Sequence, residues 1–298
     1  RPGHPGRRCL WRLSDARELA RLSGCGDAGG PVAFAEGGSH VYAAGVGEGG
    51  EPRLCVWDLG RVLSEQPQAV GGEGRCERQA AWRTAEAAPG ATPREEAPWR
   101  WFPHSVEKAQ SVQVHPETNA VVLIRGQAAL EFVSMPAMSG DADAQKGVLH
   151  DLVELPAGIS CAAFVGGRNA PLGCVCAAVG TEDGRFVLYS EQGPGQWRIL
   201  RAVWPLAGEA GPTGLRQGGV AFVRPTARGF VCGAGGLGGL LLLGPDFRPL
   251  REALPVSCED GAPAQAVAAA YAAGSAGAAL LLGTRQGDLL RVADPFDR

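Results

Sequence analysis

The chain lacks long apolar runs and clustered positive charge. Its aliphatic clusters, such as LLLL at residues 240–243, are far shorter than the roughly 18 residues that a membrane-spanning helix needs, which excludes such a helix. Lysine is almost absent, with only Lys108 and Lys146, and the formal net charge is −3. Nucleic acids and anionic membranes attract clustered cations, so we expect neither as a partner. Because nearly every cation is arginine, a single arginine does not by itself indicate a binding site.

Helix signals are also scarce. The chain holds 45 glycines and 22 prolines, and one of them interrupts almost every window of ten residues. Hydrophobic residues at a helical period, bounded by caps, are absent. Only residues 264–273, AQAVAAAYAA, have helical propensity, and their place in the repeat described below predicts a strand instead. The sequence therefore predicts an all-β fold.

The cysteines do not form the pattern of a disulfide framework. They are odd in number, scattered, and mostly placed inside apolar, β-prone runs. This pattern favours buried reduced thiols in a cytoplasmic protein over the paired cysteines of a secreted one. The nine cysteines are Cys9, Cys25, Cys55, Cys76, Cys161, Cys174, Cys176, Cys232 and Cys258.

Residues 31–59 show the repeating unit of the chain. Three short β-prone runs, at residues 32–34, 40–44 and 53–57, are separated by glycine-rich turns, and the last run ends in Trp-Asp. This is the outline of one propeller blade, a small antiparallel sheet that is stable only when stacked on similar sheets. Comparable units recur along the chain. They predict a WD40-type β-propeller with about five full blades and a partial one.

The repeats suggest a division of the chain. Residues 1–13 include RCLWRL, which we interpret as the terminal strand of an incomplete blade, with residues 14–298 forming the propeller. A polar segment rich in Pro, Gly and Glu at residues 64–98 predicts a flexible surface insertion, in which Trp82 could still mark a strand. We interpret the chain as a fragment of a larger propeller or of a tandem pair. The predicted blades are residues 14–60, 99–136, 147–191, 196–246 and 248–294.

The repeat is clearest in the last hairpin of two units. Residues 179–189, VGTEDGRFVLY, align without a gap on residues 282–292, LGTRQGDLLRV, at an offset of 103 positions. Gly184 and Gly287 fall at the turn position that requires a positive φ, which glycine adopts without a Cβ clash. Gly238 holds the equivalent place in the unit between them. The sequence thus predicts matching hairpin turns.

A succession of short motifs carries a resemblance to a known family. CVWD at residues 55–58 matches a strand that ends there in Val-Trp-Asp-Trp, with Leu59 in place of the second tryptophan. VHP at residues 114–116 with Asn119, then Gly126 before an aromatic strand, is similar to a Phe-His-Pro turn, although the following Lys-Ser-His is missing. Three further segments follow in the family's order: a mixed basic and acidic segment at residues 246–252, Leu-Pro at 254–255 in place of Ile-Pro, and LGTR at 282–285, which is similar to a Gly-Thr-Thr-Arg hairpin. Over residues 9–293, apart from 64–98, the order resembles the WD-repeat region of the echinoderm microtubule-associated protein-like family.

The resemblance implies a propeller-based domain that binds tubulin and associates with microtubules, often in cilia or the spindle. We therefore expect a non-catalytic WD-repeat interaction scaffold of the cytoplasm and cytoskeleton. A generic WD40 scaffold for protein–protein contacts in a cilium, axoneme or signalling complex is the alternative. A propeller enzyme is less favoured, because it would need several polar side chains converging from the inner strands. The inner-strand candidates, at residues 32–34, 160–164 and 219–222, are mostly small or apolar.

A glycine-rich hexapeptide, GAGGLG at residues 233–238, fits the G-x-G-x-x-G pattern of dinucleotide-binding loops. Such a site needs a helix after the loop, which directs amide groups at phosphate. The residues that follow, LLLLGP, are too short for that helix. We therefore interpret the hexapeptide as a hairpin turn and predict no cofactor.

Cysteine and histidine give no metal or catalytic signature. Strand alternation places Cys174 and Cys176 on one face, but no histidine pair at ligand spacing accompanies them and Cys161, which favours core packing. His115 is expected to be a turn residue whose ring bonds to the backbone or to a neighbouring hydroxyl. Serine hydrolase and paired-carboxylate patterns are absent as well, so we predict no catalytic and no metal site. The other histidines, which show no regular spacing, are His4, His40, His104 and His150.

The run Trp99-Arg100-Trp101-Phe102 combines aromatics with an arginine, as binding hot spots do. The alternative, which we favour, is an outer strand of the second blade with its aromatics packed inward. Likewise, we interpret residues 64–98 as a solvated loop and not as a docking segment. No partner-binding residue is assigned.

Overall fold

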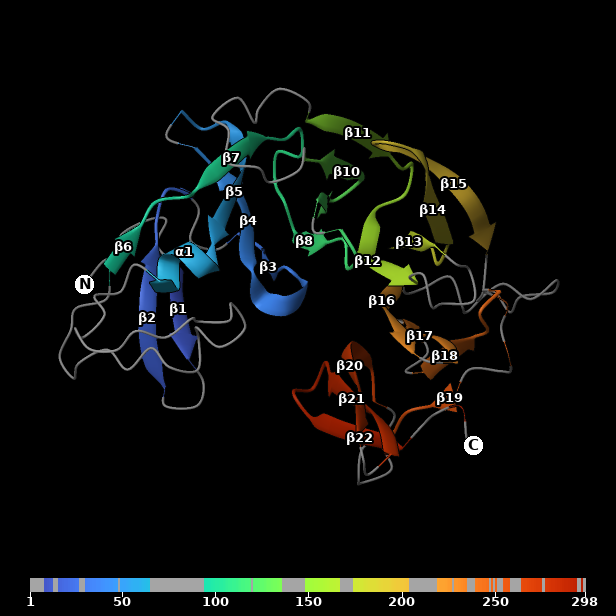
Figure 1. Cartoon of the computed structure of the whole chain (residues 1–298). Helices are drawn as coiled ribbons and strands as arrows, with labels where there is room; N and C mark the ends of the chain where they lie inside the picture. The colour runs from blue at the N-terminus through green and yellow to red at the C-terminus, as the bar shows by residue number, and fades with distance from the viewer. Residues whose placement is uncertain are drawn as a thin grey trace. The chain divides into compact units, whose positions relative to one another are not determined.

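The fold is nearly all β, as predicted (Figure 1). Residues 266–274, which carry most of the segment with helical propensity, form strand β20 (Ala266–Gly274). In the part of the chain that the structure describes, no helix is long and apolar enough to cross a membrane. The computed structural model describes residues 8–12, 16–26, 30–47, 49–64, 94–118, 120–135, 148–166, 174–203, 219–226, 228–234, 239–246, 248, 250, 254–257, 264–274, 277–293 and 296.

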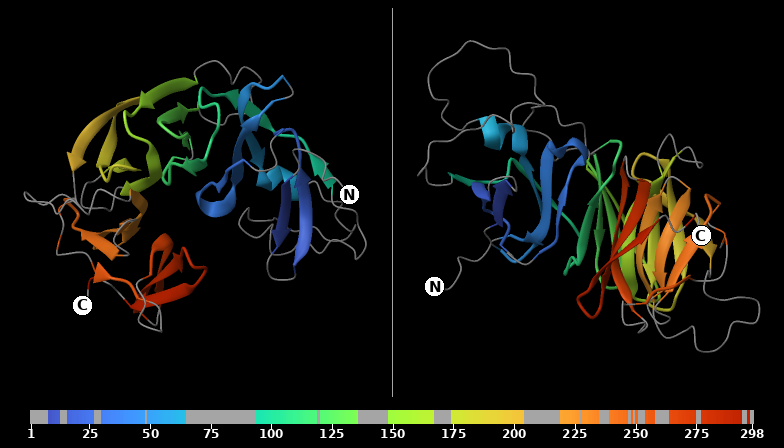
Figure 2. Two further views of the ribbon diagram at one scale, coloured as in Figure 1. Left: turned by 180° about the vertical axis from the view of Figure 1, so that it is seen from behind. Right: turned by 90° about the horizontal axis from the view of Figure 1, so that it is seen from below.

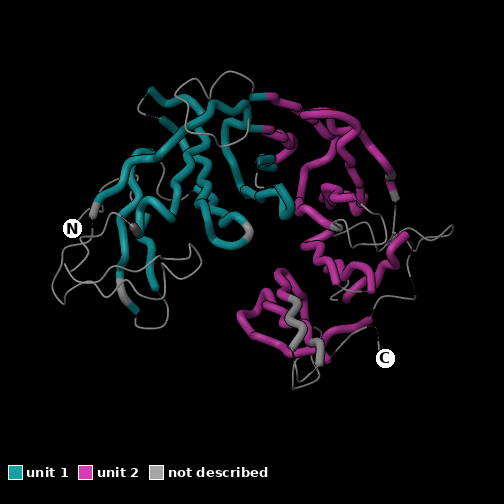
Figure 3. The backbone as a smooth tube through the Cα atoms, viewed as in Figure 1, with its two compact units in different colours: residues 1–126, 135–148 teal, residues 127–134, 149–298 magenta. Residues whose placement is uncertain are grey.

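The chain divides into two compact units (Figure 3). Unit 1 consists of residues 1–126 and 135–148, and unit 2 of residues 127–134 and 149–298. Both are built from small sheets of three or four described strands, consecutive in sequence in unit 2, whereas in unit 1 a later strand joins each of two sheets. Each unit is therefore a set of similar sheets.

Unit 1 contains a four-stranded antiparallel sheet, in the order β3-β4-β5-β7. Its strands are β3 (Val32–Phe34), β4 (His40–Val46), β5 (Pro52–Asp58) and β7 (Arg100–Pro103). After β5 the chain forms a short helix, α1 (Leu59–Ser64), because the Asp58 carboxylate accepts a hydrogen bond from the Arg61 amide at 3.2 Å and caps the first turn. A 3₁₀ turn, η1 (Glu36–Gly38), joins β3 to β4. Against β3 and β4 packs the hairpin of β8 (Ser111–Val114) and β9 (Val121–Arg125).

A second sheet of unit 1 differs from the prediction. Strand β2 (Arg17–Leu22) lies at the start of the blade predicted at residues 14–60, but it pairs with β1 (Arg8–Arg12), which lies before that blade. Strand β6 (Arg94–Glu96) runs parallel to β2, so the end of the predicted insertion is a strand. Residues 65–93, including Trp82, lie outside the described residues.

Unit 2 repeats the sheet motif. The sheets β12-β13-β14-β15 and β16-β17-β18-β19 have four strands each, and β20-β21-β22 has three described strands. Figure 2 shows these sheets side by side, and β16 contacts both β12 and β20. The strands of unit 2 are β10 (Ala129–Ser134), β11 (Leu149–Glu154), β12 (Ile159–Gly166), β13 (Val175–Thr181), β14 (Phe186–Gly193), β15 (Gln196–Val203), β16 (Val220–Thr226), β17 (Gly229–Ala234), β18 (Gly239–Leu243), β19 (Leu254–Pro255), β20, β21 (Gly277–Thr284) and β22 (Leu289–Ala293).

The hydrogen-bonded sheets are offset by one strand from the blades predicted from the sequence. Strand β11 lies at the start of the blade predicted at residues 147–191, but it pairs with β10, the strand before it. In the same way β15 pairs with β14, and β7 pairs with β5. A strand that enters the next unit thus covers the hydrogen-bonding edge of the preceding sheet, which would otherwise present unpaired amides and carbonyls.

The core lies between stacked sheets, and one strand shows why. In β18, Leu241 and Leu243 pack among residues of the β12–β15 sheet, while Leu240 and Leu242 pack among residues of the β20–β22 sheet. Side chains alternate along a strand, so a sheet buried on both faces needs a continuous apolar run. The LLLL cluster is therefore the centre of unit 2.

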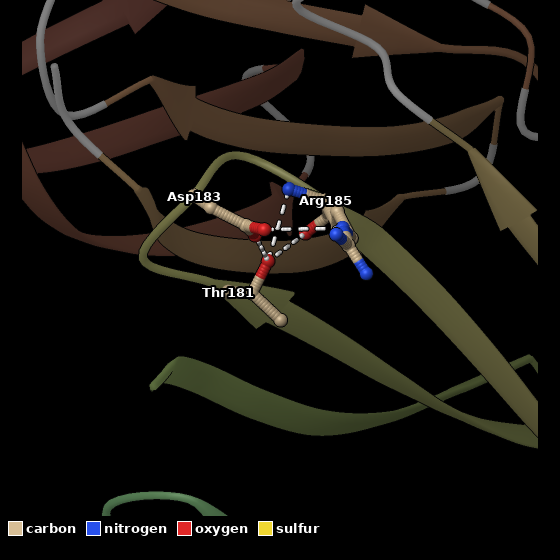
Figure 4. Close-up of polar contacts among 3 residues, drawn as sticks. All are labelled: Thr181, Asp183 and Arg185. Atoms are coloured by element: carbon tan, nitrogen blue, oxygen red, sulfur yellow. Dashed lines mark hydrogen bonds and ion pairs between the residues drawn. The ribbon is translucent and has the colours of Figure 1, made fainter. Parts of the chain in front are cut away.

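The two aligned hairpins have matching turns, as predicted. Gly184 has a φ of 85° and Gly287 a φ of 98°, and each donates its amide to a threonine carbonyl at 3.1 Å. The Thr181 hydroxyl accepts the Arg185 amide at 2.9 Å and donates to Asp183 Oδ1 at 2.5 Å (Figure 4). Thr284 accepts the Asp288 amide at 3.0 Å in the same manner. Gly238, the third predicted position, lies outside the described residues.

Candidate functional site

Strand β7 presents aromatic side chains at the edge of a sheet in unit 1. It is the last strand of the β3-β4-β5-β7 sheet, and Leu54 and Cys55 of β5 lie opposite Phe102 and Trp101. Phe102 is buried, whereas Trp101 is 39% exposed. This is the alternation of a pleated strand, in which neighbours point to opposite faces. The expectation of inward-packed aromatics is correct for Phe102 and wrong for Trp101.

Arginines stack on both tryptophans of this segment. The Arg53 guanidinium carbon lies 4.1 Å from the centre of the Trp101 ring, and that of Arg100 lies 4.3 Å from the centre of the Trp99 ring. Both distances are in the range of cation–π attraction, which holds ring and guanidinium in a fixed relation. The His40 ring lies 5.9 Å from the Trp99 ring. We call these five residues, His40, Arg53, Trp99, Arg100 and Trp101, the aromatic–arginine strip.

The electrostatics of the strip come from its arginines. Burial lowers the pKa of His40, partly offset by the charge of Asp58, so its imidazole is neutral at pH 7. Its Nδ1 lies 2.9 Å from the Ser39 hydroxyl. Arg53 also forms an ion pair with Glu51. The strip therefore combines flat apolar rings with guanidinium groups, a composition suited to binding and not to proton transfer.

The structure places the predicted turn histidine as expected. His115 is buried, and its Nδ1 accepts hydrogen bonds from the amides of Glu117 at 3.2 Å and Thr118 at 3.3 Å. His104 is buried directly after β7, and His40 lies in β4. His4 lies outside the described residues. The role of His115 is thus structural.

A buried carboxylate escaped the sequence analysis. Glu131 of β10 is fully buried, and its Oε1 lies 2.8 Å from Nδ1 of His150 in β11. A charged residue inside an apolar strand, here ALEFVS, is the signal that could have revealed it. Its partner is set by the register of two strands, which the sequence alone does not show.

The core packing expected for Cys174 and Cys176 holds for Cys176, which is buried, and not for Cys174, which is exposed. The sulfurs of Cys174 and Cys176 lie 3.9 Å apart, and Cys176 is part of the core between the β12–β15 and β16–β19 sheets. Cys161 lies elsewhere on β12, since it is paired with Gly180 and not with the start of β13. Within the described residues, no group of three or more His, Cys, Asp or Glu could hold a metal ion.

The glycine-rich hexapeptide belongs to a hairpin. Gly233 lies in β17, and β18 begins at Gly239, so a strand follows where a dinucleotide site needs a helix. A Cβ at Gly233 would lie 2.4 Å from Cε1 of Phe222, so close packing requires this glycine. Residues 235–238 lie outside the described residues.

Comparison with known proteins identifies the fold. No family model matches the chain, and no curated protein matches it. Among solved structures, the chain is similar to the periplasmic gluconolactonase PpgL of Pseudomonas aeruginosa, at 14% identity and a TM-score of 0.56, over 96% of this chain and 72% of that one. It is also similar to the β-propeller domain of Cps50 (Swd1) of Myceliophteria thermophila, at 12% identity and a TM-score of 0.53, over 98% of this chain and 82% of that one. The fold is a β-propeller. At these identities the likeness shows the fold alone.

In this propeller, polar side chains of inner strands link neighbouring blades of unit 2. The Ser160 hydroxyl of β12 donates to the Val220 carbonyl of β16 at 2.6 Å. Nε of Arg224 in β16 donates to the Ala269 carbonyl of β20, also at 2.6 Å. Each hydrogen bond joins a side chain of one blade to the backbone of the next, and so helps to hold adjacent blades together.

Proposed function

We propose that this propeller is a non-catalytic interaction scaffold that binds a protein partner through the aromatic–arginine strip, with tubulin as the partner that the sequence resemblance favours. The observation that carries the proposal is the exposed Trp101 ring with Arg53 stacked on it. Tryptophan and arginine dominate the energetics of protein interfaces. The likeness to a WD40 propeller domain supports the scaffold part of the proposal.

The strip is suited to a protein surface because its side chains are already ordered. Binding costs about 0.5 to 1.5 kcal/mol for each flexible side chain that becomes immobilised. Stacking at 4.1 and 4.3 Å holds Arg53 and Arg100 before a partner arrives. Phe102, buried on the opposite face of the same strand, anchors the backbone beneath them. Much of the ordering cost is therefore met by the fold.

Charge alone would not bring this chain to tubulin. The net charge is −3, and the surface of tubulin is acidic, so long-range attraction between the two is weak. At the strip itself, the charge of Arg53 is offset by its ion pair with Glu51, so Arg100 supplies the positive charge there. Shape-specific contacts made by the rings would then carry most of the affinity, with the arginines setting orientation.

A co-pelleting assay with stabilised microtubules at two salt concentrations tests the proposal. We expect binding that persists at the higher salt, because aromatic contacts are not screened. Trp101→Ala should weaken binding about tenfold or more, as loss of an interface hot spot does. Trp11→Ala is the matched control, since Trp11 is 51% exposed on β1, outside the strip. Failure of the unaltered chain to bind would remove tubulin and leave the generic scaffold.

A further inference from the structure

Two thiols lie in contact at the start of β13. Cys174 is exposed, whereas Cys176 is fully buried, and their sulfurs are 3.9 Å apart. The pairing of β13 with β12 begins at Val175 opposite Gly166, so Cys174 precedes the described ladder. An accessible sulfur is therefore in contact with a sheltered one, and its backbone is not held by that ladder.

The fold does not require these two cysteines. At the offset of 103 positions that aligns the two hairpins, Cys174 corresponds to Gly277 and Cys176 to Ala279. Ala279 is buried at 8% exposure in the matching strand β21, as Cys176 is in β13. Core packing thus needs only a small residue at position 176. The thiol chemistry of the pair is additional to its packing.

We propose that Cys174 and Cys176 form an oxidant-sensitive dithiol, in which a hydroperoxide oxidises Cys174 and Cys176 then closes a disulfide with it. In the first step the Cys174 thiolate attacks the peroxide oxygen, the O–O bond breaks, and a sulfenic acid and water (or an alcohol) form. In the second step the Cys176 sulfur attacks the sulfenic sulfur, the S–O bond breaks, and water leaves. The dithiol loses two electrons and two protons, and the hydroperoxide gains them.

The geometry permits the closing step. Residues two apart in a strand have Cα atoms about 6.6 Å apart, near the upper end of the range that a disulfide spans. The sulfurs must approach from 3.9 Å to about 2.05 Å, and a disulfide also needs Cβ atoms about 3.5 to 4.5 Å apart, so closure requires a shift of the backbone at Cys174, which precedes the described ladder. Burial, and then the neighbouring Cys174, raise the pKa of the Cys176 thiol. A smaller thiolate fraction at Cys176 slows the closing step relative to an unperturbed resolving thiol.

Cys9 provides an internal control for reactivity. It is also exposed, but it lies on β1, and burial together with the neighbouring Glu18 carboxylate raises the pKa of its thiol. A raised pKa leaves less of the reactive thiolate at neutral pH. Cys9 should therefore react more slowly with peroxide than an ordinary exposed thiol, and it is the reference against which oxidation of Cys174 is measured.

The test is peptide mapping by mass spectrometry after the reduced, folded chain is treated with dilute hydrogen peroxide. We expect a disulfide between Cys174 and Cys176, with free thiol at Cys174 falling at least about tenfold further than at Cys9, and full recovery with a dithiol reductant. Cys176→Ala, which Ala279 indicates will fold, should yield sulfenic and sulfinic acid at Cys174 and no disulfide. Cys174→Ser should leave Cys176 unoxidised.

Cys232→Ala is the matched core control, because Cys232 is buried in the same cluster as Cys176. It should leave the disulfide yield unchanged once circular dichroism shows a folded chain. Equal oxidation of Cys9 and Cys174, or oxidation of Cys174 without a link to Cys176 in the unaltered chain, would overturn the proposal.

Discussion

The hairpins at residues 181–185 and 284–288 share a turn and differ in their surroundings. In both, a threonine hydroxyl accepts the amide four residues on, and a glycine with positive φ closes the turn. In both, the residue after the threonine donates its amide to the chain just before the inner strand, to Gly158 in one blade and to Gln265 in the other. The same turn therefore accompanies the short motif G-T-x-x-G in both blades.

The neighbourhoods of the two hairpins are unlike. A Cβ at Gly180 would lie 2.5 Å from Cβ of Val220 and 2.7 Å from Sγ of Cys161. At the matching Gly283, the nearest atom is Cβ of Ala268, at an ordinary 3.7 Å. Phe186 is fully buried, whereas Leu289, which aligns with it, is 73% exposed. The β16–β19 sheet covers the first hairpin, so packing and not turn chemistry separates the two.

The sharpest test of this comparison is the same substitution at both glycines before the threonines. Gly180→Ala should destabilise the chain by about 1 to 3 kcal/mol, because the added methyl overpacks against Val220 and Cys161. Gly283→Ala should be neutral or stabilising by up to about 1 kcal/mol, since the position has room and alanine restricts the unfolded chain. Denaturant unfolding followed by fluorescence measures both. Equal losses would mean that the local turn, not the covering sheet, sets the cost.

Unlike Gly180 and Gly283, the two turn glycines should cost the chain the same amount of stability when replaced by alanine. Gly184 and Gly287 both hold a positive φ, and a Cβ in this region costs about 1 to 2 kcal/mol. Gly287 has no heavy atom within 4 Å of the added Cβ, so its cost is purely conformational. Gly184→Ala and Gly287→Ala should therefore shift the unfolding midpoint by similar amounts. Asparagine, which tolerates this conformation, should restore part of the loss at each site.

The two threonines test the hydrogen bond of the turn. Thr181 and Thr284 are buried, and replacing either with valine leaves one backbone amide without its acceptor. We expect a loss of about 1 kcal/mol for each, the usual net value of such a bond. Serine keeps the hydroxyl and is the matched control. A loss with serine as large as with valine would assign the effect to the methyl group and not to the hydrogen bond.

The comparison also explains what the sequence could predict. Turn glycines act within five residues, so Gly184 and Gly287 were predictable from spacing alone. A continuous apolar run such as LLLL at residues 240–243 is typical of a strand buried on both faces, and the structure places it between two sheets. The grouping of strands was less accessible, because an outer strand such as β11 pairs with the hairpin before it. An outer strand is close in sequence both to the hairpin before it and to the strand after it, so the sequence alone allows the blade boundary to be drawn on either side of that strand.

The candidate site shows the same limit. Strand alternation points Trp101 and Phe102 to opposite faces, which the expectation of inward-packed aromatics did not take into account. Which of them is covered depends on the stacking of sheets, which is a tertiary fact. The contact of Arg53 with Trp101 also requires the pairing of β5 with β7, whose ends are separated by more than 40 residues of sequence. Composition could suggest the strip, and only the sheet register could assemble it.

The smallest expected effect comes from the polar contacts that Asp183 makes in the first turn. Asp183 accepts from the Thr181 hydroxyl and pairs with Arg185 at 3.0 Å, while Gln286 holds the aligned position in the second hairpin. Asp183→Gln makes the first turn resemble the second. Both charged side chains are more than a third exposed, so solvent screens the pair, and we expect a loss of about 0.5 kcal/mol or less. The loss should shrink further at high salt, because screening weakens exposed ion pairs. A larger, salt-independent loss in denaturant unfolding would show that the Thr181–Asp183 hydrogen bond, and not charge, distinguishes the two turns.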